Sequence, residues 1–151
     1  MEILFNIGVL LFFFAFMEGF AWFTHKYIMH GWMWVWHESH HKPRKGKFEL
    51  NDLFGFMFAL PSIYLIIMGA EDFDWRFFAG LGIALYGLSY FLVHDVFVHQ
   101  RIKWFKHVNP GYFRAMRQTH HLHHAVHTKE GAQAFGFLFV KRKFYKKYAH
   151  E

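Results

Sequence analysis

Three long apolar runs separated by polar segments define the pattern of this chain. They cover about residues 3–24, 53–70 and 77–98, and each is close to the roughly 20 residues with which a helix crosses about 30 Å of hydrocarbon. A helix satisfies its backbone hydrogen bonds internally, as a membrane-spanning segment must. The pattern predicts an all-α integral membrane protein with about three transmembrane helices, forming one domain over residues 1–151.

The first run is predicted to be a span and not a signal peptide. It has no basic segment before it, contains Glu18, and leads into His25 without a small-residue cleavage site. The polar segments 24–52 and 99–151 then share one side of the membrane. They carry sixteen of the seventeen lysines and arginines, whereas the connector at 71–76 is acidic. The positive-inside rule places them in the cytoplasm.

The composition limits which metal ligands and partners are possible. Hydrophobic residues make up 54% of the chain and aromatic residues 23%. The absence of cysteine excludes disulfides, iron–sulfur clusters and thiolate zinc sites, so imidazole and carboxylate groups are the available metal ligands. The net charge of +6 suits contact with lipid headgroups. We therefore expect membrane lipid as a partner and no nucleic acid.

Histidines provide the candidate chemistry. Ten of the fourteen fall into two copies of one pattern, His-x4-His followed by His-x2-His-His, and each copy begins where an apolar run ends. Spacings of three and four place side chains on one face of a helix, and histidine is the commonest metal ligand. We predict two metal ions in a helical cytoplasmic cap formed by residues 25–41 and 94–124. The expected ligands are His25, His30, His37, His40, His41, His94, His99, His120, His123 and His124.

The His-x4-His spacing raises a geometrical problem. Residues five apart on an α-helix point about 140° away from each other. Either a bulge or an unwound turn realigns them, or the two histidines bind different ions. The sequence leaves both interpretations open.

Two carboxylates are candidates for orienting these ligands. Glu18 lies nearly two helical turns before His25, and Asp95 lies four residues before His99. The alternatives are that Glu18 snorkels or is neutral and that Asp95 caps a helix end. The remaining histidines, His107, His121, His127 and His150, are expected to be structural or interfacial.

Three further local expectations concern the polar segments. Residues 111–127 are predicted to form a helix that bears the last histidine box. The apolar stretch 132–140 is too short to cross a membrane, so it is expected to pack in the core or on the membrane surface. Asn51 or Asp52 is expected to cap the start of the second span.

The boxes and their flanking residues together resemble the bacterial β-carotene 3-hydroxylases of the membrane fatty acid hydroxylase superfamily. The resemblance extends from about Glu18 to Val140 and is highly specific as an ordered set. It is carried by HKYIMHGW at 25–32, HESHHKPRKG at 37–46, HDVFVHQR at 94–101, HHAVHTKEG at 123–131 and FGFL at 135–138.

This resemblance implies a non-haem di-iron monooxygenase of the bacterial inner membrane, with the ten box histidines as iron ligands. Such an enzyme uses O2 and electrons from an external donor, a ferredoxin with its reductase. It hydroxylates C3 of the β-ionone rings of β-carotene and related carotenoids, giving β-cryptoxanthin and then zeaxanthin.

Other interpretations remain at this point. A carotenoid ketolase or a lipid hydroxylase could use similar boxes. Outside this class, a membrane metal-transport or haem-binding protein is the main alternative, although such proteins place their ligands within the spans. The sequence also leaves a homo-oligomer open.

Overall fold

The computed structural model describes residues 1–43, 46, 48–105, 107–108 and 110–149. In this part of the chain every regular element is helical, and two of the elements are π-helices. The elements are α1 (Glu2–Phe23), η1 (Thr24–Trp32), α2 (Trp34–His41), α3 (Asp52–Gly69), α4 (Trp75–Tyr90), η2 (Phe91–Val98), α5 (Gly111–His124) and α6 (Arg142–Tyr148).

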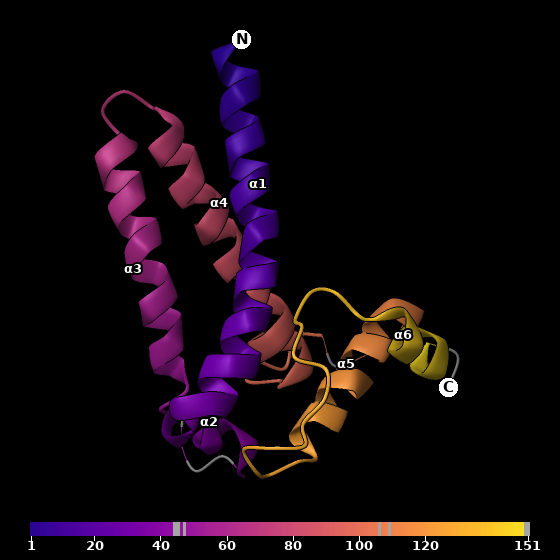
Figure 1. Cartoon of the computed structure of the whole chain (residues 1–151). Coiled ribbons are helices and arrows are strands. Elements are labelled where there is room, and N and C mark those ends of the chain that lie inside the picture. Colours follow the sequence, from indigo (N-terminus) through magenta and orange to yellow (C-terminus); the bar gives the residue numbers. More distant parts are fainter. Residues whose placement is uncertain (44–45, 47, 106, 109, 150–151) are drawn as a thin grey trace.

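Three continuous helices are long and apolar enough to cross a membrane. They are Glu2–Trp32, Asp52–Gly69 and Trp75–Val98. Figure 1 shows the N-terminus and the connection between α3 and α4 at one end of these helices, with α2 at the other end. This arrangement agrees with the predicted topology, and the all-α membrane fold predicted from the sequence is confirmed.

Helix α4 packs between α1 and α3, and small residues permit the close approach. A methyl group at Gly80 would lie 2.7 Å from the Ser62 carbonyl oxygen of α3, and one at Gly82 would lie 2.5 Å from the Leu10 carbonyl oxygen of α1. The Ser62 hydroxyl donates a 2.7 Å hydrogen bond to the Gly80 carbonyl. Small interfacial residues and hydroxyl groups are typical means of joining helices in lipid.

The cap is assembled from η1, α2, η2, α5, α6 and the irregular segment 132–141. Helix α5 ends at His124, three residues before the predicted end, which leaves the carbonyl of Val126 free to bond outside the helix. The stretch 132–140 packs in the core: Phe137 belongs to a buried cluster with residues of α1 and α4, and Val140 to one with residues of η2, α5 and α6. This segment therefore connects the spans to the cap.

The expected position of Asn51 at the start of the second span is confirmed, but its side chain does not cap the helix. Asn51 occupies the N-cap position of α3 but makes no side-chain capping bond. Its Oδ1 atom instead accepts a hydrogen bond from a histidine, and Asp52 Oδ2 accepts from the backbone N–H of Glu49.

Candidate metal centre

The fold gathers the ten box histidines into two groups of five. Within each group, the candidate ligand atoms all lie within 4.8 Å of one another. We call the group of His25, His30, His37, His41 and His123 site 1. We call the group of His40, His94, His99, His120 and His124 site 2.

Each site takes four histidines from one copy of the sequence pattern and one from the other. The exchanged residues are His40 and His123, the middle histidines of the two His-x2-His-His boxes. On an α-helix with about 3.6 residues per turn, positions i and i+4 are offset by about 40°, whereas i+3 lies about 100° from i+4. The outer pair of each box therefore serves one site, and the middle histidine faces the other.

This division of each triplet between the two sites was not predicted from the histidine spacing. The spacing argument described which residues share a helix face but could not resolve how two neighbouring sites divide that face. The rings of His41 and His124, which belong to different sites, stack with centroids 4.5 Å apart. The two sites are thus direct neighbours.

The π-helices bring the two histidines of each His-x4-His pair to the same site. His25 and His30 lie in η1, and His94 lies in η2, which His99 follows directly. A π-helix bonds residue i to i+5, and the backbone N–H of His99 donates to the carbonyl of His94 at 2.9 Å. Residues five apart are thereby placed above one another, so both members of each pair reach the same site.

The imidazoles of site 1 hydrogen-bond mainly to neutral backbone oxygens. Carbonyl oxygens accept from the Nδ1 atoms of four of its imidazoles at 2.8–3.0 Å, and Asn51 Oδ1 accepts from the fifth, His37, at 2.7 Å. The carbonyls belong to Phe135 for His25, Lys129 for His30, Val126 for His41 and Gln133 for His123.

Site 2 is held in part by carboxylates. Glu49 Oε2 lies 2.8 Å from Nδ1 of His40, and Asp95 Oδ1 lies 3.3 Å from Nδ1 of His94. Arg101 forms ion pairs with both carboxylates, at 3.1 and 3.3 Å, and with Asp52 at 2.8 Å. Site 2 therefore lies against a charged network, whereas the acceptors behind site 1 carry no formal charge.

The hydrogen bonds fix the form of the imidazoles. A carbonyl oxygen can only accept, so Nδ1 must carry the proton and Nε2 of the neutral ring presents a lone pair. For His30 and His123, both Nδ1 atoms donate to carbonyls while the two Nε2 atoms lie 3.2 Å apart. Two lone pairs facing each other repel unless a cation lies between them.

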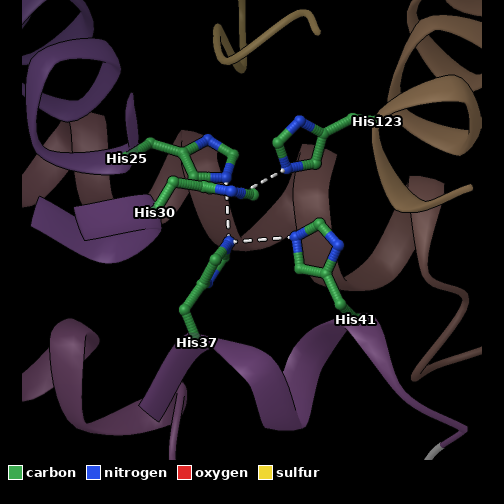
Figure 2. Close-up of side chains that lie close together, drawn as sticks. All are labelled: His25, His30, His37, His41 and His123. Carbon is green, nitrogen blue, oxygen red and sulfur yellow. Dashed lines mark hydrogen bonds between the residues drawn. The ribbon is translucent and has the colours of Figure 1, made fainter. Parts of the chain in front are cut away.

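The other close pairs repeat this geometry. Nε2 of His37 lies 3.1 Å from that of His25 and 3.2 Å from that of His41, and the same atoms of His40 and His94 are 3.1 Å apart. Figure 2 shows the site 1 rings converging from η1, α2 and α5. In site 2, the buried Nε2 of His124 has no hydrogen-bond partner among the described residues. This donor set fits a metal ion at each site.

Burial favours the neutral form of six of the box histidines. Removal from water is the largest cause, and the positive charge that neighbouring imidazoles would carry adds to it. Together they lower the pKa of His37 to about 2, of His123 to about 3 and of His41 to about 4, all from an ordinary value of 6.5. The same causes lower the pKa values of His40, His120 and His124. Neutral imidazole is the form that binds metal.

Glu18 lies in α1 and contacts the segment that follows Phe135. Its carboxylate accepts hydrogen bonds at 3.0–3.2 Å from the backbone N–H groups of Phe137, Leu138 and Phe139. It also accepts from the Tyr86 hydroxyl at 2.9 Å. Because the Phe135 carbonyl bonds His25, Glu18 supports a ligand only through this segment. Its predicted role in orienting a ligand stays a prediction.

Asp95 Oδ1 lies next to the ring of His94, a predicted ligand, and the expected role of Asp95 in orienting His99 stays a prediction. Three histidines outside the boxes, His107, His121 and His127, are exposed and belong to neither site. The fourth, His150, falls outside the described residues.

Sequence reasoning missed several residues around the sites. Asn51, Glu49 and Arg101 each contact an imidazole or its carboxylate partner. Asn51 and Glu49 lie in the connection before α3, where no periodic pattern exists to mark them. A carboxylate nine residues after His40 carries no spacing signal, because only the fold of the loop brings the two together.

Comparison with known proteins bears on what these sites do. The pattern of the family described as fatty acid hydroxylase matches residues 10–142, nearly the whole chain. The chain belongs to the fatty acid hydroxylase family. It is therefore a membrane enzyme, and its histidine sites indicate the use of metal ions. This membership favours the enzyme over the metal-transport and haem-binding alternatives.

Relatives with assigned names share much of the sequence. A protein of Pseudescherichia vulneris named β-carotene hydroxylase is 53% identical over 128 residues, covering 83% of this chain and 72% of the relative. One of that name from Pantoea ananas is 50% identical over 126 residues, covering 82% and 71%. The chloroplastic β-carotene 3-hydroxylase 2 of Arabidopsis thaliana is 42% identical over 112 residues, covering 72% and 37%. No solved structure matches the chain.

Proposed function

We propose that this protein hydroxylates C3 of the β-ionone rings of β-carotene, giving β-cryptoxanthin and then zeaxanthin. The bacterial relatives named β-carotene hydroxylase support the substrate, and the plant relative named 3-hydroxylase supports the position. The observation that carries the proposal is the convergence of all ten box histidines into two adjacent five-imidazole sites. A carotenoid ketolase would share the sites but would yield keto products.

The reaction needs a strong oxidant because the ring C–H bond is not activated. One oxygen atom of O2 enters the C–H bond, and the other leaves as water with two electrons and two protons from outside. Iron ions held by the five imidazoles of site 1 and the five of site 2 would supply the redox chemistry that activates O2.

The residues of this chain prepare the sites for that task. Acceptors at Nδ1 hold imidazoles in the neutral form with Nε2 directed inward, and burial keeps bulk water away from the ligands. His25 and His123 are 1% and 0% exposed. Both features protect an oxidising centre from side reactions with solvent.

We also propose that the sites lie on the cytoplasmic side and that a ferredoxin with its reductase supplies the electrons. The positive charge of segments 24–52 and 99–151 supports both the cytoplasmic position and the choice of donor. An acidic soluble donor would be steered to this face by its charge. Turnover with a ferredoxin donor should fall as ionic strength rises, and a rate independent of salt would contradict this part of the proposal.

The direct test is expression in cells that accumulate β-carotene, followed by chromatography of the pigments. The wild-type chain should produce β-cryptoxanthin and zeaxanthin. His123→Ala should abolish both products, because it removes a buried imidazole from site 1. The matched control is His121→Ala on the same helix, since His121 is exposed and belongs to neither site.

The control variant should retain the wild-type pigment profile. Each variant should be checked for membrane insertion and iron content. Unchanged β-carotene in cells with inserted, iron-loaded wild-type protein and an active electron donor would overturn the proposal.

A further inference from the structure

A cavity of about 220 Å³ lies at the junction of the spans and the cap. Its walls come from α1, η2, α5, α6 and the segment 134–141. Figure 1 shows this last segment beside the end of α1 that leads into η1, where the backbone N–H of Leu138 donates to Glu18. The residues that line the cavity include His94 and His120, both of which belong to site 2.

We infer that this cavity receives one β-ionone ring of the carotenoid and presents it to site 2. The inference rests on the proposed function and deepens it by locating the substrate. None of the five site 1 histidines is among the lining residues, so the cavity adjoins one site only.

The chemistry of the walls favours an apolar ring. Val98, Met116, Phe137, Val140 and Phe144 contribute buried apolar surface. The single carboxylate among the lining residues, Glu18, is already bonded to backbone N–H groups and to the Tyr86 hydroxyl. It is therefore poorly placed to hold a cation. The other charged lining residue, Lys141, is exposed, so burial of hydrocarbon is the main interaction that the inner walls offer.

The size of the cavity restricts what can occupy it. An apolar cavity of about 150 Å³ admits a benzene molecule, so about 220 Å³ suits one methyl-substituted six-membered ring. A whole carotenoid, with two rings joined by a long polyene, is far larger. The polyene and the distal ring must remain outside the cavity, in the lipid.

The exposed part of the lining indicates the route of access. Gly19 is an exposed residue of α1 within a candidate span, and Phe139 is 69% exposed. The exposed face of a span meets hydrocarbon, so a ring can pass from the bilayer to site 2 without crossing water. Since one ring enters at a time, the singly hydroxylated product must leave before the second ring can bind.

Gly19→Leu tests the cavity with little risk to folding. An added Cβ at Gly19 meets no atom within 4 Å, so the new side chain fills space at the rim. Gly8→Leu is the matched control, because Gly8 is also in α1, also meets no atom within 4 Å, and does not line the cavity. We expect Gly19→Leu to raise the KM for β-carotene about tenfold and Gly8→Leu to leave it unchanged. Equal KM values in the two variants would contradict the assignment.

A second experiment does not require turnover. β-Ionone carrying a photoreactive diazirine is cross-linked to the wild-type protein in lipid vesicles, and the labelled peptides are mapped by mass spectrometry. We expect labels at residues 93–98 and 134–141, reduced by excess β-carotene and by Gly19→Leu but not by acyclic lycopene.

The two experiments separate failure of this inference from failure of the proposed function. Labels confined to other segments, in a protein that does hydroxylate β-carotene, would overturn the ring cavity alone. Labelling of the cavity in a protein that yields no hydroxylated carotenoid would support the ring site and overturn the hydroxylase.

Discussion

Sites 1 and 2 use equal numbers of the same side chain, yet different groups lie behind the imidazoles. Site 1 bonds backbone carbonyls and the Asn51 amide, whereas site 2 bonds the carboxylates of Glu49 and Asp95. An anionic acceptor makes the imidazole it holds a stronger donor to metal. A repeated sequence pattern has thus produced two sites that match in ligand type but differ in electrostatics.

Access differs as well. All five histidines of site 1 are buried, whereas His99 and His124 of site 2 are only partly buried. Site 2 also adjoins the cavity assigned to the ring. Site 1 is therefore enclosed and backed by uncharged groups, whereas site 2 is more accessible and backed in part by carboxylates.

The largest expected effect tests the exchange of His40 and His123. Each alanine variant should lose more than about 100-fold of the hydroxylase activity, since even the partners of ligands contribute about 10–100-fold. In Mössbauer spectra of 57Fe-loaded protein, His123→Ala should perturb the same iron as His41→Ala. His40→Ala should perturb the same iron as His94→Ala. A spectrum of His123→Ala that matches His120→Ala would refute the exchange.

The next effect concerns the carboxylates behind site 2. Glu49→Gln should weaken iron binding at site 2 by about 10–100-fold and leave site 1 unchanged, because it removes the negative charge behind His40. Competition with a chelator measures the affinity. Glu38→Gln is the control, since that partly exposed residue pairs with Lys42 across one helical turn. Equal weakening of both sites by Glu49→Gln would show that they are not independent.

Asn51→Asp should make site 1 more like site 2. A carboxylate would replace the amide that lies 2.7 Å from Nδ1 of His37, and iron binding at site 1 should tighten by several-fold, up to about tenfold. Asn51→Ala should weaken it by a similar factor. Chelator competition again measures the affinity. If both variants tightened iron binding at site 1, or both weakened it, the electrostatic account would be contradicted.

Arg101→Lys should affect stability more than chemistry. Arg101 joins Glu49, Asp52 and Asp95 with its side chain 15% exposed, and lysine cannot reproduce this forked geometry. We expect a loss of about 2 kcal/mol in unfolding free energy, between the values for exposed and buried ion pairs. Unfolding in detergent measures it, and Arg142→Lys on the exposed face of α6 should leave stability unchanged.

The smallest expected effect is kinetic. When a chelator is added to iron-loaded protein, iron should leave in two phases, with site 2 emptying several-fold faster because two of its histidines are only partly buried. Stopped-flow absorbance follows the release. A single phase, or earlier loss from site 1, would show that burial does not control exchange.

The sequence was most informative where physical causes are local. Span length and histidine spacing predicted the three helices and the ten clustered residues. The π-helices could be posed only as one of two alternatives, because a spacing of five residues does not by itself distinguish a distorted helix from ligands to two different ions. Asn51 was predicted as a helix cap, but the competing hydrogen bond comes from His37, 14 residues earlier in the sequence, and no pattern made it visible.

The amino-acid sequence alone determined that this chain spans a membrane and brings ten imidazoles to one end of its spans. These properties follow from hydrophobic length and from ligand type, which each segment carries by itself. Tertiary structure decided that His40 and His123 change places, that carboxylates lie behind only one site, and that a cavity opens beside it. Those outcomes depend on how η1 and α2 meet η2 and α5, and such contacts between distant segments leave no periodic trace in the chain.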